Sequence, residues 1–243
     1  MLLVFGYLLT LPIHVFDANS GPTRPAVGTP PALPAGPESA VEQTDSGCDD
    51  LVQLESTALL GRLSIGQVAC LEASFAAATH QTDTKKVSLL LIANANGRGD
   101  KDEWEALVLR HLREIDWSDP DICYAYATHL ARKGPGRAEA VIRWSDAALE
   151  NRPHWEGDTF NSRVYGLYKL RAAAANTLFR QSERRDERLQ TDESFTAAQQ
   201  AQERLQAYSR EWLKVARLLG KNAETPLQLC LEVSQSVDLC EGE

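Results

Sequence analysis

The stretch DPDICYAYATHLARKGPGRAEAVIRWSDAALENRP, residues 119–153, decides the fold class of this chain. Its apolar and small residues recur at intervals of three and four, which is the spacing of an amphipathic helix. The run Gly134–Pro135–Gly136 interrupts the series, and Pro153 ends it. Glycine and proline are helix stop signals, so the stretch predicts two helices joined by a turn.

The same spacing continues on both sides, from about Cys48 to the C-terminus, and no segment alternates as a half-buried strand does. Ser64 is a suitable N-cap for one helix, and others are predicted near residues 87–97, 104–115, 159–184, 191–219 and 226–233. The stop signals repeat as well, because Gly99 precedes Gly134 by 35 residues and Pro120 precedes Pro153 by 33. A period near 34 residues with two helices per period predicts an all-α fold, an α-solenoid of antiparallel helix pairs.

Within residues 120–153 the chain resembles the tetratricopeptide-repeat family. The matching positions are large–small–large on the first helix and small–aromatic–small on the second: Tyr126, Ala127, Leu130, Ala140, Trp144 and Ala147. The turn is one residue longer than the usual pattern, and in the preceding unit His111 stands where a small residue is expected. The resemblance extends over residues 82–219 and fits the Sel1 type of helical repeat equally. It implies a scaffold that holds a peptide or a partner helix in a groove.

Two segments precede the helical domain, which we place at residues 48–243. Residues 1–20 begin MLLVFGYLLTLPIHVF, an apolar run that fits a signal peptide and is short for a membrane span of about 20 residues. No lysine or arginine precedes the run. Residues 21–47 hold six of the eleven prolines and no aromatic residue, which predicts a disordered linker. With arginine outnumbering lysine 18 to 7, we expect a bacterial protein exported to the periplasm or outer envelope.

The five cysteines all lie in or at the edge of the helical domain. In an oxidising compartment some of them should pair. The first candidate joins Cys230 to Cys240 and staples the C-terminal tail to the preceding helix, and the second joins Cys48 to Cys70. Cys123 is then a buried free thiol on a helix face. The spacing alone does not fix the connectivity.

The charge and the missing motifs exclude several classes of function. A net charge of −9 argues against nucleic-acid binding and against docking on an anionic membrane surface. The chain has no GxSxG, P-loop, GxGxxG or HExxH motif, and Cys123 and His129 fall on different helix faces. We therefore predict a non-enzymatic protein without cofactor, and interpret His111 and His129 as packed helix residues.

One segment partly resembles a calcium loop, with oxygen ligands and a glycine at suitable spacing: Asn94, Asn96, Gly99, Asp102 and Glu105. Arg98 stands where another oxygen ligand belongs. We interpret the segment as an inter-helix turn with Asp100 as the helix cap, and predict no metal site.

Aromatic and arginine side chains dominate binding hot spots, so they are the candidate binding residues. Trp117, Trp155 and Tyr165 lie near helix junctions and outside the core spacing, with His154–Trp155–Glu156 as the most prominent patch. The alternative is that such an aromatic fills the space between consecutive units. Arg171 and Arg180, on one long helix, line either a groove or a solvated face.

These observations predict a helical-repeat scaffold for protein–protein interaction in a bacterial envelope, with another envelope protein or a peptide as partner. One alternative is a periplasmic protein that binds a glycan or small ligand through the aromatic loops. Another is a structural subunit of an envelope machine.

Overall fold

The computed structural model describes residues 48, 50–77, 81–152, 155, 157–234 and 236–241, of which 81–82, 157–160 and 241 are described by their backbone alone. Within these ranges the regular elements are ten α-helices and a short 3-10 turn, and no strand occurs. The all-α prediction is therefore confirmed. The predicted signal peptide and linker, residues 1–20 and 21–47, lie outside the described residues. Across the described ranges, no helix is long and apolar enough to cross a membrane.

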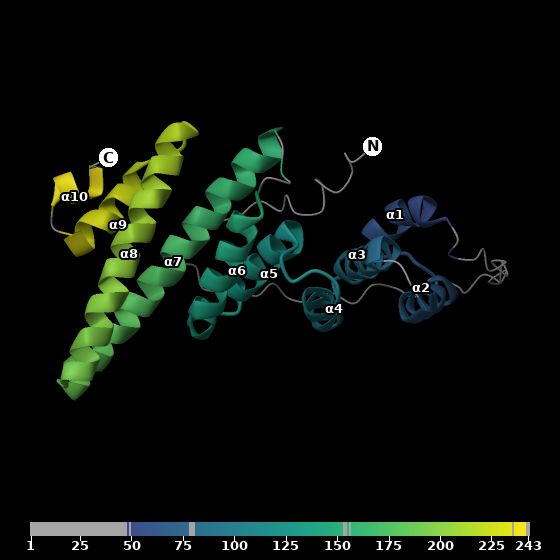
Figure 1. The fold of residues 1–243 in the computed structure, drawn as a ribbon, viewed down its shortest axis with the longest axis horizontal. Helices are drawn as coiled ribbons and strands as arrows, with labels where there is room; N and C mark the ends of the chain where they lie inside the picture. Colours follow the sequence, from purple (N-terminus) through teal and green to yellow (C-terminus); the bar gives the residue numbers. More distant parts are fainter. Residues whose placement is uncertain are drawn as a thin grey trace, which may run out of the picture.

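The helices follow one another in a single elongated row (Figure 1). They are α1 (Leu51–Leu59), α2 (Ile65–Ala77), α3 (Gln81–Arg98), α4 (Lys101–Glu114), α5 (Pro120–Arg132), α6 (Ala138–Glu150), α7 (Gly157–Leu189), α8 (Asp192–Leu218), α9 (Glu224–Ser234) and α10 (Val237–Glu241), with the 3-10 turn η2 (Pro135–Arg137) after α5. Consecutive helices pack as pairs, α3 on α4, α5 on α6 and α7 on α8, and α6 also packs on α7.

Short polar side chains fix where several helices begin. The hydroxyl of Ser64 accepts a hydrogen bond from the Gln67 N–H at 3.1 Å, while the Gln67 side chain accepts from the Ser64 N–H at 2.9 Å. This reciprocal pair starts α2 where the sequence predicts it. Asp100 caps α4 by accepting from the Glu103 N–H at 3.0 Å, as predicted, and Thr191 caps α8.

The central pair α5–α6 carries the repeat pattern on which the fold prediction rests. The rings of Tyr126 and Trp144 meet edge-on with centroids 5.7 Å apart. Ala127 is fully buried, and its small side chain lets neighbouring backbones approach closely. The long turn is explained by Gly134, whose φ of +106° favours glycine, followed by the 3-10 turn η2.

Both predicted disulfides form. Cys48 joins Cys70 with Cα atoms 5.8 Å apart, and Cys230 joins Cys240 at 5.9 Å. The first bridge ties the chain before α1 to α2, and the second ties α10 to α9. Cys123, on α5, is buried and free.

The α7–α8 hairpin is longer than the helices that cover it. At 1.5 Å per residue, the 33 residues of α7 extend about 50 Å, against about 20 Å for the 13 residues of α5 or α6. Two polar contacts join α7 to the α5–α6 region. Arg163, near the start of α7, pairs with Asp121 of α5. Gln181, further along α7, donates from its side-chain amide to the Pro135 carbonyl of η2 at 3.5 Å. The end of the hairpin where α7 meets α8 stands clear of the other labelled helices (Figure 1).

Candidate binding surface

Trp155, the centre of the predicted aromatic patch, is buried with 7% of its surface exposed. Its indole N–H donates to Asp121 Oδ1 at 2.9 Å, and its ring meets Tyr124 edge-on at 6.3 Å. This burial does not fit a Trp155 that is open to a ligand, and it agrees with the alternative that the ring fills a space between helices. The rest of the patch, His154 and Glu156, lies outside the described residues.

Arg163 completes this junction and was not singled out from the sequence. Its guanidinium pairs with Asp121 and lies over the rings of Tyr124 and Trp155, at 5.8 Å and 5.3 Å from their centroids. Burial lowers the pKa of Arg163. Helices α5 and α7 thus meet around one buried arginine, which offers no open face to a ligand.

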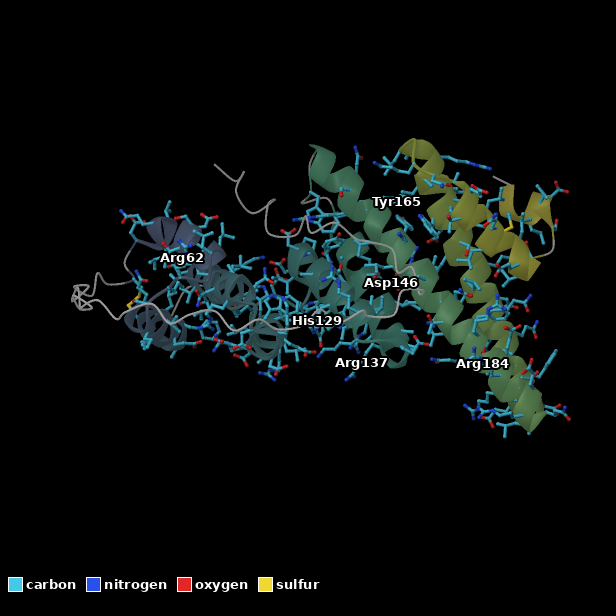
Figure 2. The ribbon with its side chains drawn as sticks, turned by 180° about the vertical axis from the view of Figure 1, so that it is seen from behind. Arg62, His129, Arg137, Asp146, Tyr165 and Arg184 are labelled. Atoms are coloured by element: carbon cyan, nitrogen blue, oxygen red, sulfur yellow. A yellow bond between two sulfur atoms is a disulfide. The ribbon has the colours of Figure 1, made fainter. Side chains whose placement is uncertain are left out.

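The other two aromatic candidates differ in exposure. Trp117, in the turn between α4 and α5, has 63% of its surface exposed, and its backbone carbonyl accepts from the Cys123 thiol at 3.6 Å. Tyr165 is half-buried near the start of α7, and its ring centroid lies 6.2 Å from that of Trp212 on α8 (Figure 2). Of the three aromatics, only Trp117 presents most of its side chain to solvent.

The two arginine candidates join helices. Arg171 pairs with Asp146 of α6 at 2.7 Å and with Glu211 of α8, and it lies against the ring of Tyr208 at 4.2 Å. Because only 11% of the Arg171 side chain is exposed, that guanidinium is committed to packing. Arg180 lies across from α9 and pairs with Glu232 at 2.8 Å.

A polar network lies inside the junction of α3, α4 and α5. His111 Nδ1 is 3.1 Å from the Ser88 hydroxyl, and His111 Nε2 is 3.6 Å from Asp119 Oδ2. Lys85 pairs with Asp119 at 2.7 Å and with Asp116 at 2.9 Å. The burial of His111 confirms its interpretation as a packed residue, and the network explains why a histidine replaces a small residue there.

The types of these side chains match a serine hydrolase, but their burial does not. In a hydrolase the serine oxygen must reach the carbonyl that it attacks. Here Ser88 is 1% exposed, His111 is fully buried and Asp119 is 4% exposed. No substrate reaches the Ser88 oxygen without unpacking α3 from α4. We therefore assign the network a structural role, that of fixing the start of α5.

The charges of this network set the pKa of Asp119. Burial opposes its ionisation, but the nearby His111, Lys85 and the Ile122 N–H outweigh it and lower the pKa of Asp119 to about 2. Burial, together with Asp119 and Asp116, raises the pKa of the Cys123 thiol to about 12. A thiol with that pKa is not a nucleophile at neutral pH.

A second cluster, at the edge of α4 and α5, is built on Glu105. This carboxylate pairs with Lys133, lies 3.6 Å from His129 Nε2 and accepts from the Tyr126 hydroxyl at 3.4 Å. The His129 ring is flanked by Trp104, with centroids 4.9 Å apart. Burial lowers the pKa of His129, so its ring is neutral at pH 7. The cluster closes the α4–α5 contact, with the Glu105 carboxylate bonded to Lys133 and to the Tyr126 hydroxyl.

The segment that resembles a calcium loop is mostly helix. Asn94 lies within α3, is buried, and its side-chain oxygen accepts from the Leu63 N–H at 3.2 Å. Asn96 accepts from Lys101, and Glu105 is occupied as described above. Within the described ranges, no group of three or more histidine, cysteine and acidic side chains is arranged to hold a metal ion.

An open groove lies on the overhanging end of α7. Its volume is about 520 Å³, and it is lined by Gln181, Arg184, Glu187 and Arg188. The Arg188 Nε–H donates to the backbone carbonyl of Arg184 at 3.0 Å, which holds the Arg188 side chain against the helix. The groove was not predicted from the sequence, because a charged helix face has the same residue pattern as an ordinary solvent-exposed face.

The two groove arginines differ from most arginines that contact other helices. Many arginines of the described residues pair with a carboxylate within 4.0 Å, among them Arg98, Arg110, Arg113, Arg163, Arg171, Arg180 and Arg204. Neither Arg184 nor Arg188 has such a partner among those residues, although Glu183, Asp186 and Glu187 are their close neighbours in sequence. Apart from the Arg188 Nε–H, which donates to the Arg184 carbonyl, the N–H groups of these two guanidiniums are available to a ligand.

Comparison with known proteins places the chain in no family. No family model, no curated protein and no solved structure matches it.

Proposed function

We propose that this protein is a non-enzymatic scaffold that binds another protein in the envelope of a bacterium. In this proposal the pairs α3–α4, α5–α6 and α7–α8 are successive units of a tetratricopeptide-like or Sel1-like solenoid. Such units stack because none buries its apolar face alone, and the stack presents an extended surface to a partner.

The observation that carries the proposal is the overhanging end of the α7–α8 hairpin. Leu189 and Phe195 are 51% and 62% exposed there. The contact between α7 and α8 at this end is polar, since the Ser194 hydroxyl donates to Asp186 Oδ1 at 2.7 Å. Apolar side chains that face outward at a projecting end contribute nothing to the fold's own core. They suit a partner that covers them.

The two disulfides support the proposed location in the bacterial envelope. Two bridges among five cysteines are expected in an oxidising compartment and are rare where glutathione keeps thiols reduced. They agree with export, for which the apolar N-terminal run is the separate sequence argument.

Chemical cross-linking of the full-length chain in its native cells, followed by purification and mass spectrometry, tests the proposal. We expect a defined partner to be recovered with the wild-type chain and lost with Leu189→Asp/Phe195→Asp. The matched control is Val52→Asp, which changes a 71% exposed residue at the other end of the row. Recovery of no partner with the wild-type chain, or equal recovery with the hairpin variant, would overturn the proposal.

A second candidate function is glycan binding, and exposed Trp117 is the observation that favours it. A flat indole in a turn suits stacking against a sugar ring. If this function is correct, an oligosaccharide titration shifts the tryptophan fluorescence of the wild-type chain, and Trp117→Ala removes the shift. An unchanged spectrum across envelope oligosaccharides rejects it.

A further inference from the structure

We propose that the groove on the end of α7 binds an acidic segment of the partner protein, with Arg184 and Arg188 each holding a carboxylate. This inference rests on the proposed scaffold function, because it assigns the partner's chemistry at the same hairpin end. The groove is lined by side chains of one helix face and is open to solvent.

The spacing of the two arginines suits this ligand. Residues four apart on a helix lie one above the other, with Cβ atoms about 5–6 Å apart. Two carboxylates of the partner lie at a similar distance from each other if they are three or four residues apart on a helix, or two residues apart on an extended strand. Each planar guanidinium can hold a carboxylate through two parallel hydrogen bonds.

No carboxylate among the described residues pairs with either arginine. The arginines that join helices in this protein already have acidic partners, as Arg171 has Asp146 and Glu211. Arg184 and Arg188 have none among the described residues, and both side chains are exposed. Gln181 adds an amide next to them, which is anchored at 3.5 Å on the Pro135 carbonyl of the turn η2.

Arg137, at the end of η2, extends the basic edge toward the α5–α6 pair. It is exposed and has no carboxylate within 4.0 Å among the described residues. Arg137 and Arg184 lie along the same edge of the molecule, far from Arg62 at the opposite end (Figure 2). A partner segment that enters the groove therefore meets further positive charge as it runs along this edge.

The surrounding charge favours an acidic peptide over a dense polyanion. The whole chain has a net charge of −9, which repels nucleic acid and anionic lipid surfaces at long range. Glu187 also lines the groove and would repel a closely spaced row of phosphates. A peptide with two separated carboxylates carries fewer negative charges and is repelled less, and a lysine of the peptide can pair with Glu187.

Fluorescence anisotropy with the full-length oxidised protein tests the inference. The probe is a labelled alanine-based helical peptide with glutamates four residues apart, and its control has every glutamate replaced by glutamine. We expect salt-sensitive binding of the glutamate peptide alone, weakened at least about tenfold in Arg184→Glu/Arg188→Glu. Arg62→Glu/Arg152→Glu is the matched control, since it makes the same charge change at two exposed arginines outside the groove.

Three results would overturn the inference: equal weakening in the control variant, equal binding of the glutamine peptide, or tighter binding of heparin or anionic vesicles than of the peptide. Circular dichroism establishes that both double variants keep their helix content. Cross-linking in cells separates this inference from the proposed function. A partner still recovered with Arg184→Glu/Arg188→Glu leaves the scaffold function intact and removes only the acidic segment. Recovery of no partner with the wild-type chain rejects the scaffold function itself.

Discussion

At the scale of single residues, buried charges have structural roles at two helix junctions. Asp119 caps α5 by accepting from two backbone N–H groups, and at the same time it pairs with Lys85 of α3. Asp121 connects the start of α5 to Arg163 of α7 and to the Trp155 indole. Removing the partner of such a group lowers the stability of the fold, because a buried charge without a partner has lost its hydration and has no compensating interaction.

The first prediction concerns the pH dependence that Asp119 contributes. Its pKa falls from an ordinary 3.8 to about 2 in the folded protein. A carboxyl with a lowered pKa stabilises the fold above its unfolded pKa and loses that contribution as pH falls through its folded pKa. At about 1.4 kcal/mol per pKa unit, the contribution at pH 7 is about 2 kcal/mol.

Asp119→Asn keeps a helix cap and removes the charge. We expect this variant to lower the free energy of unfolding by about 2 kcal/mol at pH 7, as measured by urea denaturation, with the difference shrinking between pH 4 and pH 2. Asp83→Asn, at an exposed aspartate of α3, is the control and should change little. A difference between wild type and Asp119→Asn that stays constant down to pH 2 would contradict the assignment.

At the scale of helices, the repeat pattern predicts where the elements lie but not how closely they cross. Helix α3 passes the turn after α1 at glycines on both sides. A Cβ built on Gly97 would lie 2.3 Å from the Gly61 backbone nitrogen, and one built on Gly61 would lie 2.4 Å from the Arg98 nitrogen. Asn94 fixes the same crossing by accepting from the Leu63 N–H.

The second prediction is that Gly97→Ala destabilises the protein although alanine is the better helix former. Within an ordinary helix the change would stabilise by about 1 kcal/mol. Here backbone atoms must move, and overpacking costs about 1–3 kcal/mol. Because backbone atoms are in the way, we expect the cost to exceed the gain, with a net loss of up to about 2 kcal/mol in the free energy of unfolding, measured by thermal or urea denaturation.

Gly136→Ala is the matched control for this crossing. A Cβ at Gly136 meets nothing within 4 Å, so the change should be neutral or stabilising by a few tenths of a kcal/mol. Equal stability of Gly97→Ala and Gly136→Ala would mean that the α1–α3 crossing opens without cost.

At the scale of the whole molecule, each end of the row is closed by a disulfide. Cys48–Cys70 fastens the first helices, and Cys230–Cys240 fastens the last. The helices at the two ends of the row have a neighbour on one side only. Cross-links placed there restrict the chain where packing restricts it least.

The third prediction is a thiol count that also tests the compartment. Protein isolated from its native cells under non-reducing conditions should show one free thiol out of five after denaturation. That thiol, Cys123, should react slowly with Ellman's reagent in the native state, because it is buried and its pKa is raised to about 12. Five thiols in freshly isolated protein, or a chain found in the cytosol, would contradict export.

Much of the fold was predictable because it depends on local signals. Helix spacing, stop residues and caps act within a few positions, so they placed α2 after Ser64, α4 after Asp100 and α8 after Thr191. The short helix α10 was not predicted, since its five residues carry little periodicity and it is positioned by its disulfide to Cys230 and by packing on α9 and α8.

The candidate site was less predictable, because exposure is a property of the packed molecule. Trp117 and Trp155 both lie at helix junctions in the sequence, yet one is exposed and the other is enclosed by Tyr124 and Arg163. Arg171 and Arg180 were expected to share a face of α7, but each is committed to an acidic partner on a neighbouring helix. Arg184 and Arg188, which have no such partner among the described residues, lie one and two turns after Arg180.

By itself the sequence determined an all-α chain of helix pairs, both disulfide pairings as its first candidates, and a buried Cys123. Only the tertiary structure decided which aromatic is exposed, which arginines remain unpaired, and that the α7–α8 hairpin extends past its neighbours. The physical reason is range. Helix formation follows from residues three and four apart, whereas exposure and pairing depend on side chains that approach from helices distant in sequence, as Asp121 and Trp155 do across 34 positions.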